Sequence, residues 1–372
     1  MRFRITIEDY SMGPTMKILI CRVTDVGIVL RSKQLMKNLM DEGHEIVVAA
    51  PKGAEYNSII EMGCRFIDVA IKGHGTNPVE DYLLYRRYRR LLKAERPDLV
   101  LLYTTKPNIY CGIACRLMKI PAIMNITGLG LALGNAGFMQ RFLIGLYRLA
   151  CNGTNLRKIF FQNEESLRFF RECRIGNPEV FRMIHGSGVD LTSYPVQPFP
   201  TSATVDFLFV ARVMKQKGIE EYLGAAKAIR QSHPEAVFHI LGGCDSVYQE
   251  RLERETRENT VVYHGKVNNI PDYQRLSQCT VQPSYYPEGV SNVILEAASS
   301  GRPVITTDHP GCREGVDDGI TGYIVPIRDT KALINAIERF LNLTVEERKE
   351  MGLRGRKKWN VNLIRELSLK HI

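Results

Sequence analysis

The chain has 372 residues, of which 44% are hydrophobic and 24% charged, which is typical of a soluble globular protein and long enough for two domains. Its nine cysteines have no CxxC or zinc-finger spacing, which excludes a disulfide framework and favours reduced, cytoplasmic thiols. We find neither a signal-peptide pattern nor an uncharged apolar run of about 18 residues, so we expect a cytoplasmic protein without a membrane span.

In chain order, the first half alternates between predicted strands and helices. A polar preamble over residues 1–15 precedes a strand that begins at Met16 and continues to Val23. Further strands are predicted over residues 45–50, 98–103, 122–125 and 158–162, with helices over 31–42 and 79–96. Strands that alternate with helices in this way are typical of a parallel sheet covered on both faces.

The second half repeats the alternation after a pause near residues 185–200, which we interpret as the interdomain linker. Strands are predicted over residues 205–211, 236–242, 261–264, 280–283 and 303–307, with helices over 218–232 and 291–300. The pattern predicts an α/β protein with two Rossmann-like, doubly wound parallel-sheet domains. Since ligands of such sheets bind at the carboxyl ends of the strands, we expect the functional site in a cleft between the domains.

The net charge of +10 lies almost entirely in the first half of the chain. Residues 1–190 contain 27 Lys and Arg against 18 Asp and Glu, and no acidic residue occurs between Asp98 and Glu164. This asymmetry indicates an anionic partner, which could be a phosphate-bearing substrate, an anionic membrane surface or nucleic acid. A solvated basic face without a partner is the alternative.

Loops that follow predicted strands of the first half contain candidate binding residues. Gly27 and Arg31 follow the first strand, and Thr105, Lys106 and Asn108 follow a later one. Because the carboxyl ends of parallel strands meet at one edge of the sheet, these residues are candidates for the functional site. For Arg31, an ordinary position on the helix surface is the alternative.

A glycine-rich, apolar loop over residues 125–137 contains Thr127 and Gly128 and leads into a predicted helix. That helix is apolar on most of its faces and carries Arg141 and Arg148. Such a helix can lie in a membrane interface. Alternatively, it is a core helix whose two arginines extend to solvent.

Residues 285–305 carry the strongest motif. A strand is followed by a loop with Glu288 and Gly289, and then by a helix that begins near Ser291. The glycine lets backbone approach a ligand, and the helix N-terminus offers free N–H groups to an anion such as a diphosphate. Glu296 lies in the second turn of this largely apolar helix, where an unpaired carboxylate would be costly. Two carboxylates beside a phosphate-binding helix suit a hydroxyl-rich ligand; solvated or ion-paired glutamates are the alternative.

Two cations follow the first strand of the second half. Arg212 and Lys217 lie in the loop Phe209–Gly218. Two cations in one loop at the end of a strand can hold an anionic group such as a phosphate. The sequence contains no Asp-x-Asp metal motif.

These motifs resemble those of a known family. Glu288 and Glu296 are separated by seven residues, which resembles the E-x7-E motif of the retaining GT-B glycosyltransferases of family four. The loops over residues 311–314 and 318–322 also resemble that family, and the Arg212–Lys217 loop is similar to its Arg…Lys-Gly loop. The resemblance covers nearly the whole chain from residue 16 onward.

The resemblance implies a GT-B fold and a metal-independent enzyme that moves a hexose or N-acetylhexosamine from a nucleotide sugar, UDP-linked, with retention. No cofactor is implied, because the nucleotide sugar is a co-substrate. Carried over to this chain, the catalytic positions are Glu288, Arg212 and Lys217; the donor-binding positions are Glu296, Gly289, Val290, Ser291, Asn292 and Gly265; and the acceptor-binding positions are Gly27, Arg31, Thr105, Lys106, Asn108, Thr127 and Gly128. The turn at Gly265 corresponds to the site of the nucleotide base.

The resemblance also implies the roles of the parts of the chain. Residues 16–190 would bind the acceptor, residues 191–354 would bind the nucleotide sugar, and a helix over 355–372 would cross back to the first domain. The strings 106–110 and 126–130 look like the subgroup that extends polyprenyl-diphosphate-linked sugars, whose products are surface polysaccharides or glycans. An acceptor of this kind lies in the cytoplasmic leaflet, so we expect a peripheral protein on an anionic membrane surface.

Three alternatives stay open. The enzyme could use a soluble acceptor, or it could be a nucleotide-sugar epimerase, which needs an acid/base pair that we do not find beyond Glu288. Binding of nucleic acid would explain the basic charge, but the basic residues lack interleaved aromatic platforms, so we expect no nucleic-acid partner.

Overall fold

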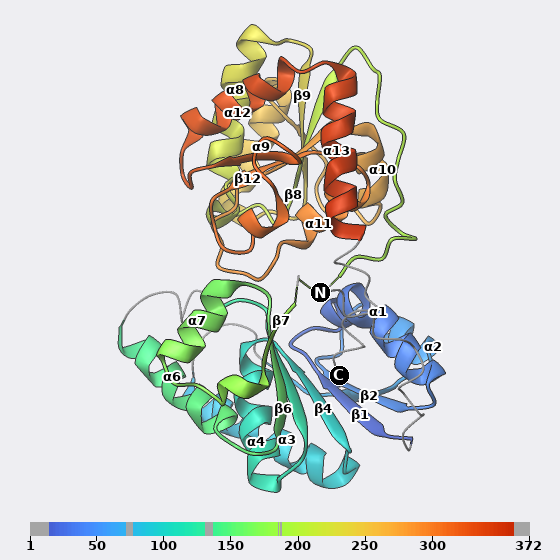
Figure 1. The fold of residues 1–372 in the computed structure, drawn as a ribbon, viewed down its shortest axis with the longest axis vertical. Helices are drawn as coiled ribbons and strands as arrows, with labels where there is room; N and C mark the ends of the chain where they lie inside the picture. The colour runs from blue at the N-terminus through green and yellow to red at the C-terminus, as the bar shows by residue number, and fades with distance from the viewer. Residues whose placement is uncertain (1–14, 72–76, 131–136, 185, 187, 361–372) are drawn as a thin grey trace, which may run out of the picture. The chain divides into compact units, whose positions relative to one another are not determined.

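The computed structural model describes residues 15–71, 77–130, 137–184, 186 and 188–360. It contains two α/β units, each built on one sheet, which confirms the predicted fold class (Figure 1). Unit 1 comprises the chain up to Ile126 with Gly137–Phe160 and Phe169–Arg182. Unit 2 comprises the short segments that begin at Thr127 and Phe161 and the chain from Met183 onward. The predicted domains 16–190 and 191–354 are continuous in sequence, whereas these units are not.

The sheet of unit 1 has the strand order β3-β2-β1-β4-β5-β6-β7. Its strands are β1 (Lys17–Cys21), β2 (Glu45–Ala50), β3 (Arg65–Asp68), β4 (Leu99–Tyr103), β5 (Ala122–Ile126), β6 (Leu156–Phe161) and β7 (Phe181–Met183). From β3 to β5 all neighbours are parallel, and the buried Leu19 pairs with Val47 on one side and Val100 on the other. The strand order reverses between β1 and β4, which is where such sheets form a ligand site.

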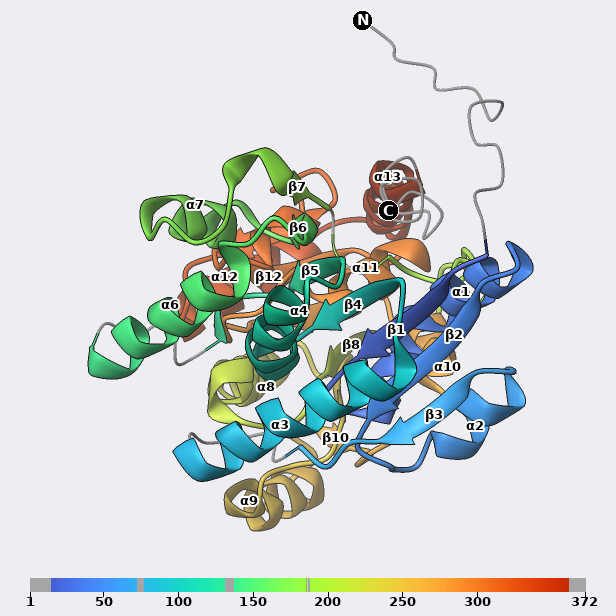
Figure 2. The same ribbon diagram turned by 90° about the horizontal axis from the view of Figure 1, so that it is seen from below.

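The helical elements of unit 1 connect these strands. They are α1 (Asp25–Asp41), α2 (Tyr56–Glu61), α3 (Pro78–Glu95), the π-helical turn η2 (Pro107–Cys111), α4 (Gly112–Met118), α6 (Phe138–Cys151), α7 (Glu164–Glu172) and the 3-10 turn η3 (Pro178–Val180). Helix α1 begins six residues before the predicted start, because Thr24 caps it by accepting a hydrogen bond from the Gly27 amide. Helix α4 packs between α3 and α6 in one layer (Figure 2).

The sheet of unit 2 has the strand order β10-β9-β8-β11-β12-β13, and every pair is parallel. Its strands are β8 (Val205–Val210), β9 (Ala236–Leu241), β10 (Val262–Tyr263), β11 (Cys279–Gln282), β12 (Val304–Thr307) and β13 (Gly322–Val325). The helical elements are η4 (Lys215–Lys217), α8 (Ile219–Ser232), α9 (Ser246–Arg257), α10 (Ile270–Leu276), α11 (Asn292–Ser299), η5 (Arg313–Gly315), α12 (Thr330–Leu341) and α13 (Val345–Asn360). The strand order reverses between β8 and β11.

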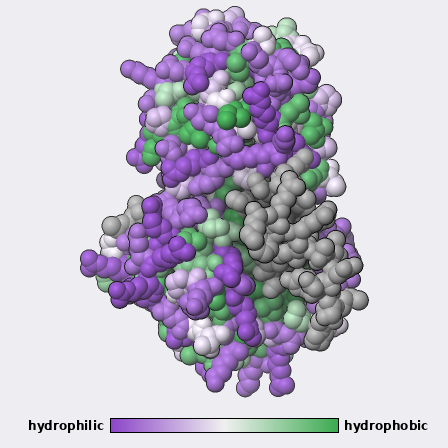
Figure 3. Space-filling view, in the orientation of Figure 1, coloured by the Kyte–Doolittle hydropathy of each residue, from purple (hydrophilic) through white to green (hydrophobic). Residues whose placement is uncertain are grey.

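Aromatic side chains fill the core of unit 2. Phe207 stacks on Phe238 with 5.0 Å between the ring centroids, and Phe340 of α12 meets Phe207 edge-on. The surface that carries α8, α12 and α13 is mainly hydrophilic (Figure 3). Helix α13 is fixed by Trp359, which is 2% exposed and donates a hydrogen bond to the Gly315 carbonyl at 3.1 Å.

The predicted terminal helix over residues 355–372 is only partly described. Residues 355–360 form the end of α13, which packs against α11 within unit 2. Residues 361–372 lie outside the described residues, as does the predicted preamble except Thr15. The return of the C-terminus to the first domain therefore stays a prediction.

Candidate functional site

The carboxyl ends of β8 and β11 carry the predicted catalytic residues in two joined loops. The Tyr285 amide donates a hydrogen bond to the Gln216 carbonyl at 2.9 Å, which ties the loop after β11 to the loop after β8. Gly218 has a φ of +80°, and a Cβ atom there would lie 2.0 Å from the Pro283 carbonyl oxygen. Only glycine permits this close approach of the two loops.

The joined loops bring Lys217 and Glu288 together. The Lys217 Nζ lies 2.6 Å from Glu288 Oε1, and the two side chains are 15% and 27% exposed. The same ammonium lies 5.0 Å from the centroid of the Tyr286 ring, within the range of a cation–π interaction. Because the pair retains some exposure, an anionic ligand can approach the ammonium while the carboxylate stays available to hydroxyl groups.

Helix α11 begins directly after this pair. Ser291 precedes the helix in an extended conformation, and its side chain makes no capping hydrogen bond within the described part of the chain. The Ser291 amide itself donates to the Gly311 carbonyl at 2.7 Å. The first amides of α11, which begin with Asn292, therefore have no side-chain cap, and such a helix N-terminus suits a phosphate group.

The other predicted donor residues differ in their surroundings. Glu296 lies half-buried on α11. The exposed Arg212 directs one guanidinium nitrogen to Met214 Sδ at 3.0 Å. Gly265 has a φ of +67° with open space around the position of a Cβ atom. Val290 is 3% exposed and packs in the apolar cluster that includes Trp359, so only its backbone can face a ligand.

Gly289 is surrounded by protein atoms. Its amide donates to the Thr127 carbonyl at 2.6 Å, and a Cβ atom there would lie 2.0 Å from Gln162 Oε1. A Cβ atom on Gly128 would lie 2.6 Å from the Glu288 Cα. Thr127 and Gly128, which we predicted to bind the acceptor, thus group with unit 2 and pack on the backbone that carries Glu288.

The remaining predicted acceptor residues lie in unit 1. The Lys106 ammonium lies 3.1 Å from Asp81 Oδ1, and both side chains are largely buried. Asn108 is 1% exposed and donates to the Asn125 carbonyl at 3.0 Å. Gly27 is in the first turn of α1, and Thr105 and Arg31 are half-buried. The side chains of Lys106 and Asn108 are therefore directed to partners within unit 1.

Sequence reasoning missed Arg22, which directly follows β1. Its side chain is almost fully buried, its guanidinium carbon lies 4.2 Å from the centroid of the Tyr103 ring, and it donates to the Gly27 carbonyl. Burial lowers the pKa of the Arg22 guanidinium to about 10. An arginine that ends an apolar strand is the only sequence signal for such a residue.

No group of three or more His, Cys, Asp or Glu side chains is arranged to hold a metal ion in the described ranges. None of the described helices combines the length and the apolar composition that crossing a bilayer requires.

Comparison with protein families gives two matches. Residues 198–358 match the family described as "Glycosyl transferases group 1", and residues 19–163 match the family described as "Glycosyl transferase 4-like". Together the two matches cover most of the chain, and they include the loop after β8 and the loop after β11.

Two curated relatives are similar over most of their length. One is the N,N'-diacetylbacillosaminyl-diphospho-undecaprenol alpha-1,3-N-acetylgalactosaminyltransferase of Campylobacter jejuni, 24% identical over 82% of this chain and 84% of the relative. The other is the UDP-Gal:alpha-D-GlcNAc-diphosphoundecaprenol alpha-1,3-galactosyltransferase of Escherichia coli, 26% identical over 84% of each chain.

Solved structures share the fold of both units. The crystal structure of Anabaena HepE in complex with UDP and glucose has a TM-score of 0.76 and 16% identity, over 96% of this chain and 100% of that one. Sucrose-phosphate synthase from Thermosynechococcus elongatus has a TM-score of 0.75 and 19% identity, over 95% of this chain and 97% of that one.

Proposed function

Since the chain belongs to the group 1 glycosyltransferases of family four, with the GT-B fold, we propose that it transfers a hexose or N-acetylhexosamine from a UDP-sugar to a polyprenyl-diphosphate-linked sugar. The observation that carries the donor half of this proposal is the Lys217–Glu288 pair at the N-terminus of α11. It places a cation and free amides beside a carboxylate, which suits a sugar joined to a diphosphate.

The proposed reaction assigns a task to each of these groups. Lys217, together with Arg212 and the amides of α11, stabilises the charge on the diphosphate as the bond to the sugar carbon breaks. Glu288 accepts hydrogen bonds from the sugar hydroxyls and orients the ring, and Glu296 does the same for the ribose. The acceptor hydroxyl forms the new bond on the same face of the sugar, and its proton leaves on the released nucleoside diphosphate. No metal takes part, so we expect activity to persist in EDTA.

The acceptor half of the proposal rests on the relatives and on charge. Both curated relatives carry names that place their acceptors on undecaprenyl diphosphate. The basic excess of residues 1–190 suits such an anionic carrier. A soluble acceptor is the second candidate.

We further propose that the protein is cytoplasmic and binds reversibly to an anionic membrane surface through unit 1. On α6, Phe138 is 83% exposed and Phe142 44% exposed, with the basic Arg141 between them. On α3, Val79 and Tyr82 are exposed before a basic run, Arg86–Lys93. Exposed apolar residues next to basic ones are typical of helices that lie on a membrane.

The donor site is tested by nucleotide-sugar binding. We would compare UDP-, GDP- and ADP-sugars by thermal shift and slow hydrolysis, with Lys217→Ala and the matched control Lys215→Ala, an exposed lysine of the same η4 turn. We expect UDP-sugars alone to stabilise the wild type and the control, and Lys217→Ala to lose the shift. If no nucleotide sugar binds the wild type, the proposed reaction is wrong.

The acceptor is tested separately, with the donor fixed. A polyprenyl diphosphate that carries N-acetylglucosamine would be compared with a soluble aryl glycoside of the same sugar. Transfer to the lipid-linked sugar alone supports the proposal, whereas equal transfer to both would favour the soluble-acceptor alternative.

A further inference from the structure

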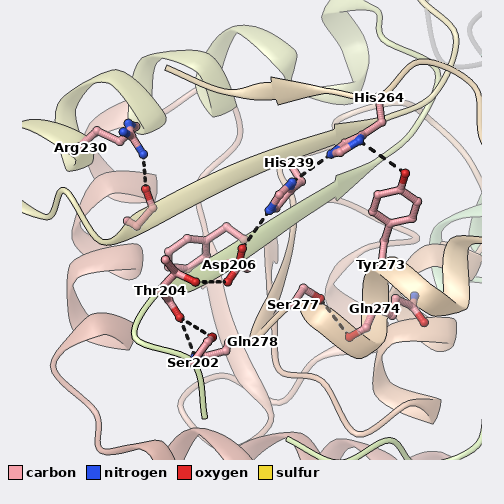
Figure 4. A network of polar contacts seen from close by, with 12 residues as sticks. Ser202, Thr204, Asp206, Arg230, His239, His264, Tyr273, Gln274, Ser277 and Gln278 are labelled. Atoms are coloured by element: carbon pink, nitrogen blue, oxygen red, sulfur yellow. Dashed lines mark hydrogen bonds and ion pairs between the residues drawn. The ribbon is translucent and has the colours of Figure 1, made fainter. Parts of the chain in front are cut away.

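Four polar side chains of unit 2 form a continuous chain of hydrogen bonds (Figure 4). Asp206 Oδ1 on β8 lies 2.9 Å from His239 Nε2 on β9. His239 Nδ1 lies 3.0 Å from His264 Nε2, just after β10, and His264 Nδ1 lies 3.4 Å from the Tyr273 hydroxyl on α10. Each imidazole thus uses both of its nitrogens.

The direction of the hydrogen bonds follows from Asp206. An ionised carboxylate can only accept, so His239 Nε2 carries a hydrogen and donates it. In the neutral ring the other nitrogen of His239 then accepts from His264 Nε2–H. That leaves His264 Nδ1 to accept from the Tyr273 hydroxyl, so all donors point toward Asp206, whose second oxygen accepts from Thr204 Oγ1 at 2.9 Å.

This chain can take up one proton and no more. A proton added at His264 Nδ1 makes that nitrogen a donor to the Tyr273 oxygen, so this bond reverses, while His264 Nε2–H still donates to His239 Nδ1. A second proton would set two N–H groups against each other at the 3.0 Å His–His contact. Burial, followed by the neighbouring His239, lowers the pKa of His264, which favours the neutral form of this imidazole.

The charged and titratable groups facing the two imidazoles come from each neighbouring element: Asp206 from β8, the partner imidazole from β9 or β10, and Tyr273 from α10. Lys266, next in the chain after Gly265, is exposed. The carboxylate lies at one end of the chain and the phenol at the other. A change in the protonation of Asp206 or of either histidine therefore affects the hydrogen bonds of the turn that contains His264.

The turn at His264 belongs to the carboxyl edge of the sheet. The Gly265 carbonyl accepts from the Gly242 amide at 2.8 Å, and the Tyr263 hydroxyl donates to the Gly242 carbonyl at 3.0 Å. These bonds join the loops after β9 and β10, on the side of β8 away from β11. With the diphosphate at α11, the base extends toward this turn if the nucleotide lies across the strand ends.

We propose that the chain Asp206–His239–His264–Tyr273 is a positioning device for the nucleotide base: its neutral form holds the His264–Gly265 turn for donor binding, and uptake of one proton, which reverses the His264–Tyr273 bond, weakens that hold. This inference rests on the proposed UDP-sugar site and adds a requirement for the base. Donor affinity should therefore fall in acid, whereas binding of a diphosphate without a base should not depend on the chain.

The test measures Kd for UDP and for inorganic pyrophosphate between about pH 5.5 and pH 8. The variants are His239→Asn, the milder Tyr273→Phe, and His233→Asn as the matched control, whose imidazole pairs with Glu235 outside the chain. Ratios of variant to wild-type Kd at each pH cancel the titration of the ligand itself.

We expect His239→Asn to weaken UDP about tenfold near neutral pH, or about 1.4 kcal/mol, and much less in acid, with pyrophosphate unchanged. Tyr273→Phe should act in the same direction with a smaller effect, and His233→Asn should match the wild type. Nitrogen NMR at about pH 8 should show both imidazoles protonated on Nε2.

The inference would be overturned if His239→Asn and Tyr273→Phe both showed the same dependence of the UDP Kd on pH as the wild type. It would also be overturned if NMR found a hydrogen on His264 Nδ1 at about pH 8. Neither result would contradict the proposed function. Equal weakening of UDP and pyrophosphate would also overturn the inference, because that result indicates general damage to unit 2. If the wild type binds UDP no more tightly than pyrophosphate at any pH, both the proposed UDP-sugar site and this inference are wrong.

Discussion

At the scale of single residues, the contribution of the Glu288 charge to activity can be measured separately from the contribution of its shape. Glu288→Gln keeps the volume and removes the negative charge beside Lys217, which makes the ammonium more available to phosphate. We expect UDP affinity to be kept or improved and kcat to fall about 100-fold, since the sugar loses an oriented charged acceptor. Steady-state kinetics with a UDP-sugar, with Glu250→Gln on the exposed face of α9 as control, would measure this; an unchanged kcat would remove Glu288 from catalysis.

The pKa of His264 leads to a prediction about the pH dependence of stability, also at the scale of a single residue. This pKa is lowered in the folded protein, first by burial and then by His239. The unfolded chain takes up a proton below about pH 6.5, before the folded protein does, so stability falls as the pH drops from there through the folded pKa. Thermal unfolding at about pH 7.5 and pH 5.5 should show a smaller loss in His264→Gln than in the wild type. An equal loss would contradict the lowered pKa.

At the scale of elements, the loop before α11 depends on Gly311. This residue has a φ of +91°, and a Cβ atom there would lie 2.2 Å from the Gly289 carbonyl oxygen. Gly311→Ala should therefore destabilise unit 2 by about 1–3 kcal/mol and displace Glu288, weakening UDP binding. Gly243→Ala is the control, because a Cβ atom there meets open space. Chemical denaturation and UDP titration of both variants would measure the difference, and equal stability of the two would show that the loop adapts.

Helix α6 is the element whose surface role can be isolated. Phe138→Ser with Phe142→Ser removes two exposed apolar side chains in its first half and leaves Arg141 unchanged. We expect binding to phosphatidylglycerol vesicles to fall at least about tenfold, because each buried CH2 contributes about 0.8 kcal/mol. Val247→Ser, 78% exposed on α9 of unit 2, is the control. Equal sedimentation of the variant and the wild type with vesicles would place the membrane contact elsewhere.

At the scale of the whole molecule, the sequence predicted the strands and helices that alternate along the chain. It did not predict the contacts between residues that lie far apart in the sequence. Alternating strands and helices predicted both sheets, and the motif spacing predicted Glu288 beside a helix N-terminus. The burial of Arg22 over Tyr103 depends on two strands far apart in the sequence. Likewise Val290 occupies a motif position, yet its side chain packs in the cluster with Trp359, because the fold and not the spacing decides which way it points.

The uneven charge of the whole chain leads to a last prediction. Residues 1–190 carry 27 basic and 18 acidic residues, whereas the remaining 23 and 22 nearly cancel. Raising ionic strength from about 0.05 M to 0.5 M shortens the Debye length from about 14 Å to about 4 Å, which weakens attraction to anionic vesicles far more than a partly buried ion pair. Vesicle binding should therefore fall steeply with salt while the Kd for UDP changes only a few-fold. Both quantities would be measured in the same salt series. If vesicle binding and the Kd for UDP depended equally on salt, the attraction for anions would lie at the donor site and not at a basic surface of unit 1.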